Sequence, residues 1–113
     1  IIRSDFDGFV CAVFIKAAKG RDIPVVWVEP DEMRKGEFES VEGDIIANLP
    51  WKKGCSMWFD HHVTNRISES FDGAFDIVPS AAGLVHEYFR QFFKRDFSHQ
   101  SFDFPAPYHY SRD

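Results

Sequence analysis

Two aspartates near the start of the chain have the type and spacing to bind divalent cations. Asp5 and Asp7 are separated by one residue, and Gly8 follows them. Carboxylate oxygens are preferred ligands of Mg²⁺ and Mn²⁺, and two of them in one loop can bind one ion or two neighbouring ions. Gly8 would let the chain turn without a side chain that blocks the ions. An aspartate that caps a helix gives the same pattern, so this motif alone leaves both interpretations open.

A second polar group, Asp60, His61 and His62, comes directly after the apolar residues 57–59. Imidazole nitrogens bind first-row transition metals, and a nearby carboxylate can orient a ring through a hydrogen bond. Side chains alternate in direction along a strand, so one ring could bind a metal while the other contacts a phosphate. An isolated pair of this kind is more often two exposed loop histidines. The aspartate and the strand-end position favour a functional role.

Alternating strands and helices would position these residues. Apolar segments predict strands at residues 1–2, 24–28, 44–49 and 56–59. Residues 24–28 form a continuous run of branched and aromatic side chains, which indicates a strand buried on both faces. Helices are predicted at residues 9–19, near 31–34, and at 81–95. This alternation indicates an α/β fold with a mainly parallel sheet flanked by helices.

The two longer predicted helices each have one apolar face. Gly20 stands where a helix commonly ends, and Ser80 is a candidate cap for the second helix. His86 falls away from the apolar face of the second helix, which predicts a solvated side chain. The first apolar face comprises Phe9, Val10, Val13, Phe14 and Ala17. The second comprises Leu84, Val85, Tyr88, Phe89 and Phe92, with Lys94 and Arg95 in the last turn.

The candidate site residues all stand at predicted strand ends. Asp5 and Asp7 follow the first strand, Asn48 ends the third, and Asp60 begins the polar group after the fourth. In parallel sheets, ligands bind beyond the carboxyl ends of the strands, near the point where strand order reverses. We therefore expect these side chains to gather at one edge of the sheet.

The composition excludes some classes of function. The 113 residues have a formal net charge of -5, which argues against a surface that follows a nucleic-acid backbone. No apolar run approaches the roughly 20 residues of a membrane helix. Cys11 and Cys55 are far apart and lie in apolar surroundings, which predicts buried free thiols and a reducing, cytoplasmic setting. The chain begins at Ile1 without an initiator Met, so we expect a fragment.

Three motifs, in order and spacing, resemble the DHH phosphoesterase family. They are Asp-Phe-Asp-Gly at 5–8 before an apolar helix, Phe-Asp-His-His at 59–62, and Ser-Ala-Ala-Gly-Leu-Val at 80–85. The resemblance covers residues 1–95. It implies a metal-binding domain at 1–96, with an irregular tail at 97–113. It also implies hydrolysis of a phosphoric ester or anhydride, and the pattern is most similar to the exopolyphosphatase-like branch.

The resemblance also implies a role for each polar residue. Asp5 would bind one metal ion, and Asp7 and His61 would bind the second. Asp60 would support the metal ligands, and His62 would donate a hydrogen bond to the substrate phosphate. Asp7 and His62 are thus the implied catalytic residues. The implied cofactors are two Mn²⁺ ions, with Mg²⁺ as the alternative, which activate water.

Three positions depart from the family pattern. Arg3 and Ile1 stand where members commonly have a ligating histidine, although Arg3 could bind a phosphate with its planar guanidinium group. Asn48 stands where members have a metal-bridging aspartate, and it is kept as a weaker candidate ligand.

The resemblance further implies parts and partners beyond these residues. A later ligand and a carboxyl-terminal domain would follow Asp113, so the fragment is expected to be inactive alone. The expected partner is a small phosphorylated substrate: polyphosphate, a short oligonucleotide or a cyclic dinucleotide. A homodimer is possible.

Two alternatives remain open. Residues 5–8 also resemble the first motif of haloacid-dehalogenase-like phosphatases, in which Asp5 would be a covalent nucleophile and Asp7 a general acid, with Mg²⁺ as cofactor. That family favours Thr or Val at the position of Phe9, and it gives no reason for the histidine pair. The other alternative is a non-catalytic phosphate-binding domain, which Arg3 and Asn48 favour.

Overall fold

The chain folds around a five-stranded sheet in which all strands are parallel. The computed structural model describes residues 1–35, 41–90 and 93. The order of the strands is β2-β1-β3-β4-β5. The strands are β1 (Ile2–Arg3), β2 (Trp27–Val28), β3 (Ile45–Ala47), β4 (Met57–Asp60) and β5 (Gly73–Phe75). The helices are α1 (Phe6–Lys19), α2 (Pro30–Arg34), the 3₁₀ helix η1 (Val63–Asn65) and α3 (Ala81–Tyr88). The predicted α/β class and parallel sheet are confirmed.

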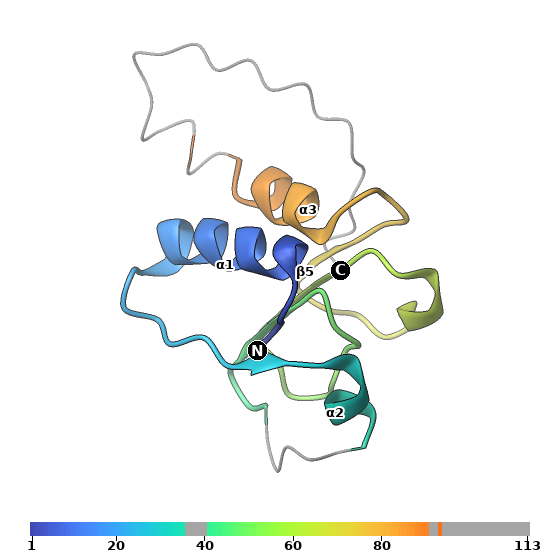
Figure 1. The fold of residues 1–113 in the computed structure, drawn as a ribbon. Coiled ribbons are helices and arrows are strands. Elements are labelled where there is room, and N and C mark those ends of the chain that lie inside the picture. The colour runs from blue at the N-terminus through green and yellow to red at the C-terminus, as the bar shows by residue number, and fades with distance from the viewer. Residues whose placement is uncertain (36–40, 91–92, 94–113) are drawn as a thin grey trace.

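Helices cover both faces of the sheet. α1 and α3 pack side by side on one face, and α2 lies on the other (Figure 1). One core contains Ile15 and Leu84 from the helices and Phe59 from the sheet. The second core, on the α2 side, is centred on Trp58 and Ile46. Because adjacent side chains of a strand point to opposite faces, Trp58 and Phe59 anchor different cores.

Helix α1 begins three residues earlier than predicted. Asp5 is its N-cap, and the carboxylate of Asp5 accepts a hydrogen bond from the Gly8 N–H. Asp7 and Gly8 therefore lie in the helix and not in a loop. A Cβ atom at Gly8 would come 1.9 Å from the carbonyl oxygen of Arg3. The glycine thus allows the first turn of α1 to pack directly on the end of β1, a role that the sequence did not predict.

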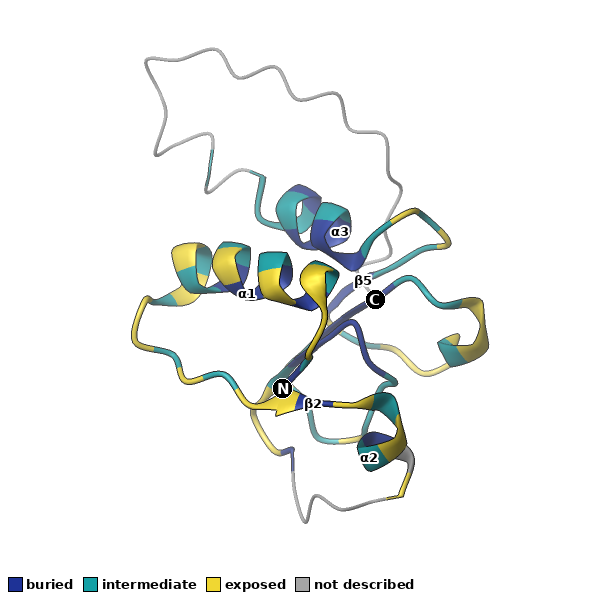
Figure 2. Ribbon diagram, viewed as in Figure 1, coloured by how far each residue is buried: buried dark blue, intermediate teal, exposed yellow. Residues whose placement is uncertain are grey.

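The apolar face predicted for α1 is also wrong. Gly8, Cys11, Ala12 and Ile15 are buried against the sheet. Phe9, Val13 and Ala17 are exposed, and Val10 and Phe14 are only partly buried. Figure 2 shows exposed residues along the outer side of α1. The helix is apolar on nearly all sides, so its periodicity does not reveal which face is buried. The small residues pack on the sheet because they allow a close approach of the backbones.

Strand β2 is an edge strand. Val28 is buried, but the side chain of Trp27 is 45% exposed and Val26 is also exposed. The prediction of a strand buried on both faces is therefore wrong, although the strand exists. Among the described residues it has one neighbouring strand, β1. Only the side that carries Val28 reaches the core beside α2.

Strand β5 has no counterpart among the predicted strands. It begins at Gly73, which has a φ of 130°, and a Cβ atom there would lie 2.0 Å from the carbonyl oxygen of Trp58. Glycine is required because β5 pairs very closely with β4. An Asp-Gly pair followed by two apolar residues resembles a turn in the sequence, which hid the strand.

Helix α3 confirms the predicted Ser80 cap, because the Ser80 hydroxyl accepts a hydrogen bond from the Gly83 N–H at 3.1 Å. Leu84 and Val85 are buried as predicted. The solvated position predicted for His86 is wrong, since its ring packs against Phe14 and stacks on Phe93. The predicted helix continues beyond α3 to residue 95. Its residues Phe92, Lys94 and Arg95 lie outside the described residues, as does the tail at 97–113.

Two further predictions concern the cysteines and the membrane. Neither cysteine forms a disulfide; Cys11 is buried as predicted, whereas Cys55 is only half-buried. Within the described ranges, no helix is both long enough and apolar enough to cross a membrane.

Candidate active site

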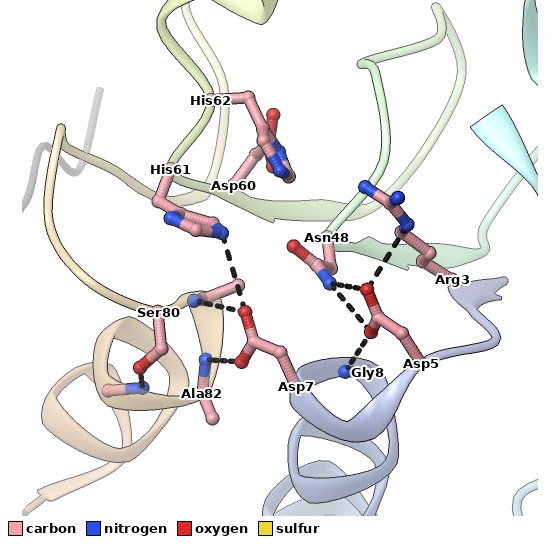
Figure 3. Close-up of polar contacts among 12 residues, drawn as sticks. Arg3, Asp5, Asp7, Gly8, Asn48, Asp60, His61, His62, Ser80 and Ala82 are labelled. Atoms are coloured by element: carbon pink, nitrogen blue, oxygen red, sulfur yellow. Dashed lines mark hydrogen bonds and ion pairs between the residues drawn. The ribbon is translucent and has the colours of Figure 1, made fainter.

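The candidate residues meet where the order of the strands reverses. β1 lies between β2, which follows it in the chain, and β3. This is the position at which open parallel sheets bind ligands, beyond the carboxyl ends of the strands. The structure brings all seven predicted residues to this edge (Figure 3). They are Arg3, Asp5, Asp7, Asn48, Asp60, His61 and His62.

Asp5 is held by three groups from two strand ends and one helix. Its Oδ1 accepts from the Gly8 N–H at 2.8 Å, which caps α1. The Asn48 amide donates to Oδ1 at 3.0 Å and lies 3.3 Å from Oδ2. The Nε of Arg3 lies 3.1 Å from Oδ2. These contacts fix the carboxylate while about two fifths of the side chain stays open to solvent.

Asn48 carries an unsatisfied polar atom. Its backbone has a φ of 62°, a conformation that asparagine adopts more readily than most residues. The residue is only 2% exposed, and its Oδ1 is buried without a hydrogen-bond partner in the described part of the chain. In Figure 3 this oxygen lies on the side that faces His61. A buried acceptor left unpaired costs about 1–3 kcal/mol, so this oxygen is suited to a cation or a donor bound at the site.

Asp7 joins the two long helices. Its Oδ2 accepts from the Ala81 N–H and its Oδ1 from the Ala82 N–H, each at 2.9 Å. Both donors belong to the first turn of α3, where N–H groups lack partners within the helix and the dipole favours negative charge. This structural role was not predicted from the sequence. The pairing links residues more than 70 positions apart, and no local pattern indicates it.

His61 is oriented as a metal-binding histidine would be. Its Nδ1 lies 2.8 Å from the carbonyl oxygen of Val78, so Nδ1 carries a hydrogen and donates it. Its Nε2 lies 3.4 Å from Oδ2 of Asp7. If the ring is neutral, Nε2 carries a lone pair that faces the Asp7 carboxylate. That arrangement is favourable only when a proton or a cation lies between the nitrogen and the oxygen. A backbone carbonyl that fixes the tautomer is the usual support of a ligating histidine.

His62 forms a chain with a buried carboxylate. Asp60 is fully buried, and its Oδ1 lies 2.7 Å from Nδ1 of His62. The other oxygen accepts from the Asn65 side chain at 2.8 Å. The Nε2 of His62 is thereby left for another partner, on a side chain that is one-third exposed. Asn65 was not predicted; its only signal is an amide residue in the polar turn after the histidines.

The local electrostatics favour a cation. The pKa of the buried Cys11 thiol is raised well above its usual range, first by burial and then by the negative charges of Asp7, Asp5 and Asp60. The three carboxylates therefore all lie near Cys11. Such a concentration of negative charge attracts divalent ions.

The donor chemistry fits a divalent ion, although the ligand set is partial. Asp7 and His61 offer an oxygen and a nitrogen, and Asp5 and Asn48 offer two kinds of oxygen. No cluster of three or more His, Cys, Asp or Glu side chains that could hold a metal is found in residues 1–35, 41–90 and 93. The unpaired Asn48 oxygen adds an amide ligand beside these side chains.

Comparison with known proteins finds a similar protein among the solved structures. No family model matches the chain, and no curated protein matches it. Among solved structures, the chain is similar to the pGpG-specific phosphodiesterase PggH from Vibrio cholerae. The match is to a phosphodiesterase. The identity is 38% over 77% of this chain, with a TM-score of 0.61. The matched region spans 28% of that phosphodiesterase.

Proposed function

We propose that this chain provides the metal-binding half of the active site of a DHH-family phosphodiesterase that cleaves a short oligonucleotide such as pGpG. The observation that carries the proposal is the meeting of Asp5, Asp7 and His61 at the strand-order reversal. The similarity to PggH, at 38% identity, supports a phosphodiester over inorganic polyphosphate as substrate. This changes the expected branch, because the motifs alone favoured an exopolyphosphatase-like enzyme.

In this proposal, four side chains bind divalent ions, Mn²⁺ or else Mg²⁺. Asp7 and His61 would form one binding group, and Asp5 with the free oxygen of Asn48 would form the other. Bound ions would supply an activated water molecule and neutralise the phosphate charge. The protein fixes these ligands before binding, because Gly8, Ala81 and Val78 hold them through backbone groups.

Two side chains would bind the phosphate through N–H groups. With a hydrogen on each ring nitrogen, His62 would donate from Nδ1 to the buried Asp60 and from Nε2 to a phosphate oxygen. Arg3 contacts Asp5 through Nε, which leaves both terminal amino groups of its guanidinium outside that ion pair. Those two groups can contact two phosphate oxygens together. Asp60 itself, fully buried, would act only through His62.

Hydrolysis by the complete protein tests the proposal. With Mn²⁺ present, the protein should cleave pGpG faster than inorganic polyphosphate or a cyclic dinucleotide. His61→Gln should abolish cleavage. The matched control is His86→Gln on α3, which should retain activity. Calorimetry should show Mn²⁺ binding that is weakened by His61→Gln and not by His86→Gln. Uncleaved pGpG, or equal rates for wild type and His61→Gln, would rule the function out.

The haloacid-dehalogenase-like alternative requires Asp5 to act as a nucleophile. Both of its oxygens already accept hydrogen bonds or an ion pair, from Gly8, Asn48 and Arg3. A free nucleophilic oxygen would need those contacts to break. Trapping of an aspartyl-phosphate on Asp5 during turnover would nevertheless establish that mechanism.

The non-catalytic alternative rests on Asn48, whose neutral amide donates to Asp5 at 3.0 Å. An amide that satisfies Asp5 without a cation is what a relic site would contain. In that case the complete protein would be inactive with Mn²⁺, and Asn48→Asp would restore cleavage of pGpG. Activity in the unmodified protein excludes this alternative.

A further inference from the structure

Phe6 is an aromatic side chain placed in water at the candidate site. It is 82% exposed, which is the highest value among the exposed large hydrophobic side chains of the described residues. It stands between Asp5 and Asp7, two of the carboxylates of the site. Exposure of a phenyl ring is unfavourable, and neither the capping of α1 nor the proposed ligands require an aromatic residue here.

Phe6 lies at the end of α1 that carries the candidate site. Phe6 is the first residue of the helix, and Cα–Cβ bonds in a helix tilt toward its amino terminus. That terminus is the end at which Asp5 and Asp7 hold their contacts (Figure 3). The side of α1 that packs on the sheet carries Gly8 and Ile15, so the ring of Phe6 stays clear of the core.

We infer that Phe6 forms a stacking platform for a nucleobase of the substrate. This inference rests on the proposed function and adds a base subsite to it. A phosphodiester held between Arg3 and His62 would place the nucleoside attached to it within reach of the neighbouring first turn of α1. Any of the planar nucleobases can stack on an aromatic side chain. Inorganic polyphosphate has no ring to stack, so this contact selects for nucleotides.

A competing explanation is that the outer side of α1 is covered by protein. Phe6, Phe9 and Val13 are all exposed and have the spacing of one helical stripe. A protein interface would use the whole stripe, whereas a base subsite needs only the residue in the first turn. Phe9 is therefore the matched control, because it has the same side chain and is one turn farther from the site.

The test compares three substrates of the complete protein. One is pGpG, and the other two are analogues in each of which one guanine is removed but the ribose is kept. Phe6→Ala should raise KM for pGpG about tenfold with kcat nearly unchanged, since stacking binds ground and transition states alike. Phe6→Trp should restore the KM. Phe9→Ala should leave it unchanged. For one of the two analogues, wild type and Phe6→Ala should have the same KM.

The outcomes separate the inference from the proposed function. If wild type cleaves pGpG but Phe6→Ala leaves its KM unchanged, or raises it equally for both analogues, the base subsite is wrong and the phosphodiesterase stands. An equal effect of Phe9→Ala, with a changed oligomeric state by light scattering, would assign the stripe to an interface. No cleavage of pGpG by wild type would overturn both. Melting temperatures equal to wild type check that each variant is folded.

Discussion

The two halves of the candidate site are built differently. Around Asp5, the carboxylate is held by side chains and by the first turn of its own helix, and it stays partly open to solvent. Around Asp7, the carboxylate is bound to the backbone of a second helix. The nearby Asp60 is fully buried. The first half can thus change with little effect on the fold, whereas the second half is part of the fold.

The largest expected effect comes from Asp7→Ala. The change leaves the N–H groups of Ala81 and Ala82 without their acceptors, and we expect the free energy of unfolding to fall by about 2–4 kcal/mol. Cleavage of pGpG should be lost as well. Urea denaturation followed by circular dichroism measures the loss of stability. Unchanged stability would mean that α3 does not depend on Asp7, and the two halves would then be alike.

Asp5→Asn should separate chemistry from folding. Asparagine caps helices as well as aspartate, so the free energy of unfolding should change by less than about 1 kcal/mol. The affinity for Mn²⁺ should fall at least about tenfold, since even residues that only support a metal ligand have effects of that size. Calorimetry on folded protein measures the affinity. A large loss of stability with unchanged affinity would reverse the comparison.

Asn65→Ala tests the support of the second half. It removes the hydrogen bond at 2.8 Å to the buried Asp60, which should cost about 1–2 kcal/mol of stability. Because Asp60 positions His62, kcat for pGpG should fall several-fold even well below the temperature of unfolding. Thr64→Ala, an exposed change in the same short helix, should affect neither quantity. Loss of stability with normal kcat would give Asn65 a purely structural role.

The smallest effect concerns His86, away from both halves. Burial lowers the pKa of His86 below its usual 6.5, against a smaller opposing effect of Glu87. The unfolded chain therefore binds a proton more readily, and stability from this group is lost as pH falls through about 6.5. His86→Phe should make the unfolding free energy less sensitive between about pH 7.5 and pH 5.5. Identical pH profiles of the two proteins would contradict this.

The sequence predicted the positions of residues at strand ends. It did not predict features that depend on contacts with other parts of the fold. Asp5, Asn48 and Asp60 were placed correctly because parallel strands bring their carboxyl ends to one edge. The buried face of α1 could not be predicted, because apolar residues occupy nearly every side of it. Trp27 appeared buried because periodicity does not reveal whether a strand lies at an edge. The bonds from Asp7 to α3 join distant positions, so only the folded chain shows them.

The attachment of Asp7 to α3 also makes that helix an indicator of the site. Any cation that draws electron density from the Asp7 carboxylate weakens its two backbone hydrogen bonds at 2.9 Å. The amide protons of Ala81 and Ala82 would then change resonance frequency and exchange faster with solvent. Nuclear magnetic resonance of these two alanines would thus report occupancy of the site directly, without a substrate and without turnover.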